Sequence, residues 1–174
     1  MTLKLDSDDF ELFAIDRRFG QSRPVLDARW RSLQAEVHPD RFAAQGGAAK
    51  RVAMQWAMRV NEAYERLKDP LKRAAYLCEL NGAPISAEEN TAMPSGFLVQ
   101  QLEWRESLEE AATHEQLRTL AEEVGSRREA ALERLERLLD VDRDYPAAAQ
   151  EVRVLMFIER FAHDVERRLE ALEQ

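Results

Sequence analysis

Residues 38–42 read His-Pro-Asp-Arg-Phe, and this stretch lies between two segments with helical periodicity. Before it, four apolar side chains recur at spacings of four, three and four residues: Leu26, Trp30, Leu33 and Val37. Ser22 can cap this helix and Pro24 fits its first turn. Because Pro39 restricts His38 to extended backbone geometry, the helix is predicted to end near Val37.

A second, longer helix is predicted after Gln45-Gly46-Gly47, so the tripeptide His38-Pro39-Asp40 lies on a loop of about ten residues. The apolar stripe of that helix is Val52, Trp56, Val60, Ala63 and Leu67. Asp69 and Pro70 then start a further helix, which the pair Asn81-Gly82 ends. A short helix starting at Asp8 or Asp9 precedes the hairpin.

The composition changes after residue 82. Residues 83–96 contain two prolines, a glycine and several polar side chains, which is typical of a linker. Three longer helices are predicted beyond it: one capped by Ser95 and ending near Ala112, one with a Thr113/Gln116 capping box, and one from about Ala147. The prediction is therefore an all-α chain with a helical hairpin domain at 1–82, a linker at 83–94 and a three-helix bundle at 95–174.

Composition and charge exclude several classes of protein. The single cysteine, Cys78, rules out an intramolecular disulfide and a CxxC zinc site. Residues 1–82 carry 14 Lys/Arg against 12 Asp/Glu, whereas the rest carry 11 against 21, so the net charge of −8 is the sum of +2 and −10. Such an acidic second half argues against nucleic acid as a partner. The absence of long apolar runs and of a targeting segment predicts a cytoplasmic protein.

The tripeptide is accompanied by further residues in a fixed order. Arg41-Phe42 follows at once, then residues 60–70, VNEAYERLKDP, then residues 71–76, LKRAAY. This combination resembles the J-domain family, whose members stimulate ATP hydrolysis by DnaK-type chaperones. The resemblance implies a chaperone-binding site at His38, Pro39, Asp40, Arg29, Arg31 and Arg41. Arg41 stands where the commonest J-domain pattern has lysine.

The chemistry of the loop suits such a site. Pro39 stiffens the backbone, which lowers the entropic cost of presenting its neighbours. His38 offers a ring donor and acceptor, and Asp40 offers a carboxylate that can accept from an arginine. One alternative is that the tripeptide only ends a helix. A catalytic role for His38 with Asp40 is rejected, because the chain offers neither a convincing nucleophile nor a phosphate loop.

In the bundle, helical periodicity separates inward from outward side chains. Phe97, Trp104, Leu108 and Ala111 form one inward stripe, whereas Val99 and Leu102 face away from it beside Glu103 and Glu106. The last helix carries a strict heptad stripe: Leu155, Ile158, Ala162, Val165, Leu169 and Leu172. Phe157 lies about 200° around the helix from Leu155 and is predicted to lie outside the core. These off-stripe residues indicate a binding patch for a protein with an apolar spot and a basic rim.

Over its whole length the chain resembles the HscB family of specialised J-type co-chaperones in bacterial iron–sulfur cluster assembly. Residues 74–82, 97–106 and 152–157 carry this resemblance. It implies that the bundle binds the cluster scaffold IscU and that the J-domain recruits the DnaK-type ATPase HscA. The scaffold-binding residues would be Leu98, Val99, Leu102, Glu103, Glu106 and Phe157. Eukaryotic relatives can carry a four-cysteine metal site; with one cysteine, this chain is expected to hold no metal or other cofactor.

Two other functions remain open at this stage. A generic J-domain protein would use the acidic bundle to deliver unfolded clients to a DnaK-type chaperone. A structural adaptor would instead dimerise through the heptad seam of the last helix. The resemblance favours a monomer, in which that seam is internal.

Overall fold

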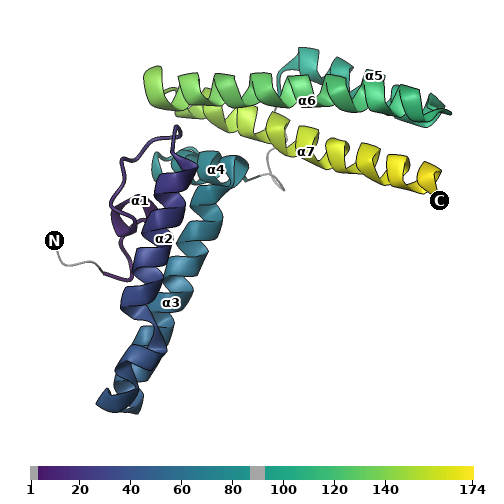
Figure 1. The fold of residues 1–174 in the computed structure, drawn as a ribbon. Helices are drawn as coiled ribbons and strands as arrows, with labels where there is room; N and C mark the ends of the chain where they lie inside the picture. The colour runs from purple at the N-terminus through teal and green to yellow at the C-terminus, as the bar shows by residue number, and fades with distance from the viewer. Residues whose placement is uncertain (1–3, 87–92) are drawn as a thin grey trace. The chain divides into compact units, whose positions relative to one another are not determined.

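Every regular element that the structure describes is a helix, which confirms the all-α prediction (Figure 1). The structure is a computed structural model and describes residues 4–86 and 93–174. The chain forms two compact units, Met1–Leu77 and Cys78–Gln174. Residues 87–92 of the predicted linker lie outside the described residues. Within the described residues, none of the helices combines the length and apolar character needed to cross a membrane.

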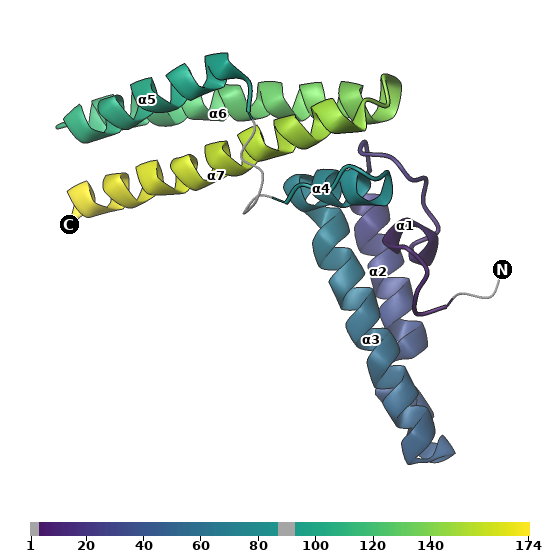
Figure 2. The same ribbon diagram turned by 180° about the vertical axis from the view of Figure 1, so that it is seen from behind.

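The N-terminal unit is built on a helical hairpin. Helices α2 (Arg23–Val37) and α3 (Gly47–Lys68) lie side by side in both views, joined at one end by the 3₁₀ helix η1, Pro39–Gln45 (Figures 1 and 2). The short helix α1 (Asp9–Leu12) and helix α4 (Pro70–Leu80) lie towards the other end. Local signals set these boundaries: the Asp8 carboxylate accepts from the Glu11 amide, and Asp69 Oδ1 accepts from the Leu71 amide at 2.9 Å.

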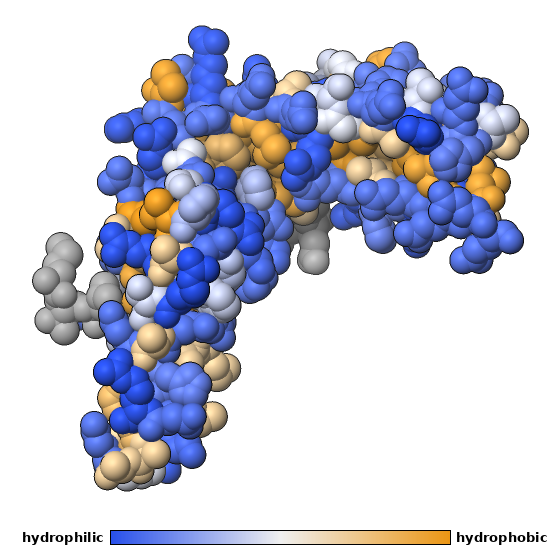
Figure 3. Space-filling model, viewed as in Figure 1, coloured by the Kyte–Doolittle hydropathy of each residue, from blue (hydrophilic) through white to orange (hydrophobic). Residues whose placement is uncertain are grey.

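The core of this unit lies at the α1 and α4 end of the hairpin. Seven of its apolar side chains are at most 3% exposed: Phe10, Leu12, Phe13, Leu26, Val60, Leu67 and Leu77. Near η1 the predicted stripe of α3 is not buried, because Val52 is 51% exposed and Trp56 is only partly covered. Apolar side chains reach the surface at this end of the hairpin (Figure 3).

A buried ion pair ties α1 to α3. The Asp9 carboxylate is fully buried and contacts Arg59 Nη2 at 2.8 Å and Arg66 Nε at 2.6 Å. The Asp9 amide donates to the Tyr76 hydroxyl at 3.0 Å, and the Arg66 guanidinium lies over the Tyr76 ring. The hydrogen bond with Asp9 raises the pKa of Arg66 above its usual value. The contacts of Asp9 join residues 50 or more positions apart, and they were not predicted from the sequence.

The C-terminal unit contains three long helices, α5 (Ser95–Glu110), α6 (His114–Glu136) and α7 (Tyr145–Glu173). In both views α6 lies beside α7 and α5 lies along α6 (Figures 1 and 2). The predicted Thr113/Gln116 capping box is present. Pro94, not Ser95, occupies the N-cap of α5, and α7 starts at Tyr145 because Asp144 caps the Ala147 amide at 3.1 Å. A π-helical turn, η2 (Arg137–Val141), follows α6.

The buried face of α7 is wider than the predicted heptad stripe. Leu155, Ile158 and Val165 are fully buried as expected, but Leu172 is 48% exposed. Val152, Val154 and Phe161, which the stripe omits, are at most 4% exposed. A core helix of a bundle buries a broader arc than the narrow seam of a coiled coil, and this explains the difference.

Candidate partner-binding sites

The tripeptide His38-Pro39-Asp40 lies at the end of α2 and forms the start of η1 rather than a plain loop. His38 has φ −60° and ψ 128°, the extended geometry that a following proline imposes. The side chains of His38 and Asp40 are 59% and 85% exposed. His38 Nδ1 accepts from the Asp40 amide at 3.2 Å, so in this geometry the ring proton is on Nε2, which is available to an external acceptor. The corner therefore offers a partner one ring donor and one carboxylate.

The predicted arginines do not all lie together. Arg29 and Arg31 are exposed on α2, and two positions along a helix correspond to about 200°, so their side chains leave different sides of it. Arg31 lies one turn from Asp27 and contributes to holding the pKa of that carboxylate low, after the hydrogen bonds from Tyr64 and Arg23. Arg41 is exposed, and its Nη1 donates to the Ala35 carbonyl at 3.0 Å, where it caps the end of α2.

The outward face of α5 carries large apolar side chains. Leu98, Val99 and Leu102 are 49%, 56% and 63% exposed, whereas Phe97 and Trp104 on the inward face are at most 5% exposed. Leu98, Leu102 and Glu106 follow one another at four-residue intervals, as do Val99 and Glu103, so these five side chains lie on adjacent rows of one surface. The predicted combination of an apolar spot and a carboxylate border is present on α5. We call these five residues the α5 face.

Phe157 is not outside the core, as the heptad stripe predicted, but partly exposed at its edge. Its ring lies 5.6 Å from the Phe97 ring and 6.0 Å from the Phe161 ring, measured between centroids. It therefore packs against Phe97 of α5 and Phe161 of its own helix while remaining partly exposed. Arg105 covers the ring with its guanidinium 5.7 Å from the centroid.

A small hollow beside Phe157 was not predicted from the sequence. It has a volume of about 220 Å³ and is lined by Arg105, Leu108, Glu109, Phe157, Arg160, Phe161 and Asp164. Arg105 and Arg160 come from two helices, so only packing brings them to one place. The only signal in the sequence was spacing, since Arg105 lies three residues before Leu108 and Arg160 lies three residues after Phe157.

The cysteine and the two other histidines of the chain lie outside these surfaces. Cys78 is fully buried, and burial raises the pKa of its thiol to about 11, which disfavours the thiolate. The His114 and His163 side chains are 46% and 68% exposed. Within residues 4–86 and 93–174, no group of three or more His, Cys, Asp or Glu is placed to hold a metal ion.

Comparisons with known proteins agree over the whole chain. Residues 93–166 match the family model described as the HSCB C-terminal oligomerisation domain. The co-chaperone protein HscB homolog of Burkholderia multivorans is 52% identical, with 98% of this chain and 99% of the relative aligned, and the Burkholderia thailandensis homolog is 49% identical over the same shares.

Two solved structures have the same fold. The chaperone HscB from Vibrio cholerae superposes with a TM-score of 0.83 at 33% identity, covering 95% of this chain and 99% of that one. Human co-chaperone protein HscB superposes with a TM-score of 0.81 at 25% identity, covering 99% of this chain and 85% of the human one. The N-terminal hairpin with its exposed His-Pro-Asp corner is thus a J-domain, followed by the helical domain typical of these relatives. The chain belongs to the HscB family, whose members are co-chaperones of iron–sulfur cluster assembly and not enzymes.

Proposed function

We propose that this co-chaperone binds the iron–sulfur scaffold IscU through the α5 face and Phe157, and stimulates the ATPase of the DnaK-type chaperone HscA through its His-Pro-Asp corner. The IscU-binding part of this proposal rests on one observation, the exposure of three large apolar side chains. Leu98, Val99 and Leu102 are 49%, 56% and 63% exposed. Such a cluster of large apolar side chains on one helix has an energetic cost in water that a partner removes.

The charge around this surface defines the partner further. Glu103 and Glu106 border the apolar side chains and favour a partner whose apolar spot has a basic rim. Residues 83–174 carry a net charge of −10, from 11 Arg against 21 Asp/Glu, and this adds long-range attraction for a basic protein. A generic unfolded client offers no matching arrangement of charge, so the observations favour a folded scaffold.

The chaperone half is supported by the geometry of the corner. The exposed His38 ring and Asp40 carboxylate are held on a proline-stiffened backbone, so little conformational freedom is lost on docking. With scaffold and chaperone on one chain, stimulated hydrolysis would close the chaperone on the scaffold and favour release of its cluster.

Leu102→Ala tests the scaffold half. Leu102 is 63% exposed, so this change should weaken IscU binding by about 1–3 kcal/mol in a calorimetric titration while the melting temperature stays near that of the wild type. Leu172→Ala is the matched control, since Leu172 is 48% exposed at the far end of α7. Phe157→Ala should weaken binding too, but it should also lower stability because it removes contacts with Phe97 and Phe161.

Two results would contradict the proposal. Unchanged IscU affinity in the Leu102→Ala variant would exclude the α5 face as the scaffold site. If Leu102→Ala weakened the binding of a denatured client and left IscU binding unchanged, the chain would instead be identified as a generic J-domain protein. Light scattering of the wild type checks the predicted monomer, because a structural adaptor that dimerises through the heptad seam of the last helix would have twice the mass.

A further inference from the structure

Helix α5 is held unevenly along its length. Its C-terminal half is anchored by Trp104, whose ring stacks on Phe161 at 5.4 Å between centroids and whose Nε1 donates to the Glu123 carboxylate at 3.1 Å. In residues 95–103, all of which the structure describes, Phe97 is the only buried side chain. The first turns of α5 therefore depend on the packing of a single ring.

This weakly held part of α5 carries the apolar residues of the α5 face. Leu98 and Val99 directly follow Phe97, and Leu102 lies one turn after Leu98. The N-cap residue, Pro94, makes no side-chain capping hydrogen bond. A helix end without such a cap opens more readily, and opening would disperse the exposed side chains. Whatever holds Phe97 in place thus also holds the α5 face.

Arg127 of α6 contacts the Phe97 ring. Its guanidinium carbon lies 5.4 Å from the ring centroid, within the range of a cation–π interaction. The Phe157 ring of α7 borders Phe97 at 5.6 Å between centroids, with an angle of 83° between the ring planes. Phe97 is 5% exposed, so water screens its attraction to the cation less than on an open surface.

A buried carboxylate faces Arg127 from α7. Glu151 is 4% exposed, and its Oε1 lies 3.6 Å from Arg127 Nη1. Its Oε2 lies 3.4 Å from Arg134 Nε. A carboxylate at this depth requires cations beside it, so it favours a guanidinium in this position. Glu151, Arg127 and Phe97 form a continuous contact from α7 through α6 to α5, which we call the Arg127 bracket.

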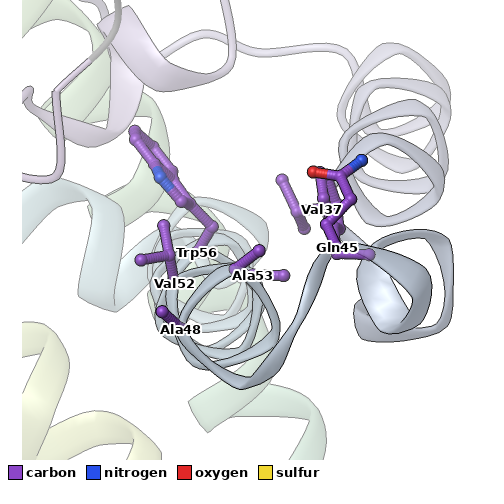
Figure 4. A pocket seen from close by; sticks show the side chains of 8 residues that line it. Val37, Gln45, Ala48, Val52, Ala53 and Trp56 are labelled. Atoms are coloured by element: carbon purple, nitrogen blue, oxygen red, sulfur yellow. The ribbon is translucent and has the colours of Figure 1, made fainter.

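The J-domain hairpin shows a helix seam without such a bracket. At its η1 end, a hollow of about 430 Å³ remains between α3 and the end of α2. Figure 4 shows Val37 and Gln45 on one side of this hollow and Trp56 of α3 on the other. None of the described residues that line it is charged: Val37, Phe42, Gln45, Ala48, Ala49, Val52, Ala53 and Trp56. Between α5 and α6, the Phe97 ring and the Arg127 guanidinium meet instead.

We propose that Arg127 is a positioning residue for the scaffold-binding surface. Through Phe97 it fixes the first turns of α5 and so keeps the α5 face ordered for IscU. This inference rests on the proposed function, because the α5 face is the surface that Arg127 positions. Arg127 lies on α6, outside the α5 face, and acts without contacting the scaffold. When part of the population has an open α5, only the ordered fraction binds, and the apparent affinity falls accordingly.

The test combines amide hydrogen exchange with a calorimetric titration of the full chain with IscU. Arg127→Ala should raise the exchange rate of the amides of residues 99–103 about threefold relative to those of α6 and α7. It should also lower the affinity for IscU about twofold. Arg127→Lys keeps a cation beside the ring and should restore most of both properties.

Arg128→Ala is the matched control. Arg128 is the next residue of α6 and pairs with Glu159 of α7 at 3.0 Å, so its loss removes an ion pair between α6 and α7 without touching Phe97. Arg127→Ala also removes an ion pair between these two helices. A general loss of stability is therefore common to both variants, and only Arg127→Ala should act selectively on α5.

A double-mutant cycle tests whether the effect passes through the ring. Phe97→Leu keeps an apolar side chain but removes the aromatic face that the guanidinium contacts. In this background, Arg127→Ala should no longer change the exchange of α5 relative to α6 and α7. An equal effect of Arg127→Ala in both backgrounds would show that Phe97 does not transmit it and would overturn the inference.

The Leu102→Ala variant separates this inference from the proposed function. If Leu102→Ala weakens IscU binding but Arg127→Ala matches Arg128→Ala in exchange and affinity, the inference is overturned and the proposed function stands. The same holds if Arg127→Ala speeds the exchange of α5 but leaves IscU affinity unchanged. If Leu102→Ala leaves IscU affinity unchanged, the proposed function is overturned, whatever the exchange of α5 shows.

Discussion

Among single residues, His38 combines exposure with a fixed geometry. Its Nδ1 accepts from the Asp40 amide at 3.2 Å, which orients the ring and leaves Nε2 as the donor towards a partner. A glutamine at this position retains polarity but lacks the rigid ring. Since the side chain is 59% exposed, little of the fold depends on it.

The residue-level prediction is that His38→Gln abolishes stimulation of the chaperone ATPase while changing the free energy of unfolding by no more than about 0.5 kcal/mol. The measurements are a steady-state ATPase assay and urea denaturation followed by circular dichroism. His163→Gln is the matched control, because His163 is 68% exposed on α7 and has no role in the proposed docking. Stimulation by His38→Gln equal to that of the control would exclude the corner as the docking site.

Between elements, the Asp9 ion pair holds α1 against α3. The carboxylate is fully buried, and Arg59 and Arg66 are 15% and 32% exposed. Asp9→Asn should lower the free energy of unfolding by about 2–3 kcal/mol, because it removes the buried carboxylate that both guanidinium groups contact. Arg66 then keeps only a longer contact with the exposed Glu62 carboxylate, at 3.7 Å. Urea denaturation measures the free energy of unfolding, and Asp6→Asn on the exposed surface should change it by no more than about 0.5 kcal/mol. If Asp9→Asn and Asp6→Asn changed the free energy of unfolding equally, the buried ion pair would contribute nothing to the packing of α1 against α3.

The stability of the packing between α2 and α3 should depend on pH through Asp27. Hydrogen bonds from the Tyr64 hydroxyl and the Arg23 guanidinium lower the pKa of this carboxyl below its ordinary value of 3.8. A group with a lowered folded-state pKa contributes stability above 3.8 and loses it as the pH falls through the folded value. Asp27→Asn and Tyr64→Phe should therefore each lose less stability than the wild type on acidification from about pH 5. The check is the urea midpoint across that range, and parallel curves for all three proteins would contradict the prediction.

The elements that the sequence predicted best are those with local signals. Ser22 occupies the N-cap position of α2, although its side chain makes no capping hydrogen bond, and Pro39 follows the C-cap of the same helix. The Thr113/Gln116 pair starts α6. These signals act within one turn of a helix and need no knowledge of the fold. The burial of Asp9 and the packing of Phe157 could not be predicted this way, because each depends on residues brought from distant parts of the chain. Periodicity alone separated Val99 and Leu102 of the α5 face from Phe97 and Trp104, whereas Leu98 was implied only by the resemblance to the HscB family.

For the molecule as a whole, the proposed function needs two sites on one chain. The His-Pro-Asp corner belongs to the unit Met1–Leu77 and the α5 face to the unit Cys78–Gln174. Joining two binding sites covalently gives each bound partner a local concentration of about millimolar for the other. At micromolar concentrations of the free proteins, the chain would thus favour transfer of the scaffold to the chaperone by bringing the two together.

This physical linkage predicts a specific result with two complementary variants. The experiment measures the HscA ATPase rate while each variant is added, with IscU present. Leu102→Ala should still give the stimulation seen without IscU, but it should lose the further stimulation that IscU adds. His38→Gln should lose both. An equimolar mixture of the two variants contains every side chain of both sites, but on separate chains, so it should behave like Leu102→Ala alone at half the concentration. Recovery of wild-type stimulation by the mixture would show that the two sites act independently and that linkage through one chain is not required.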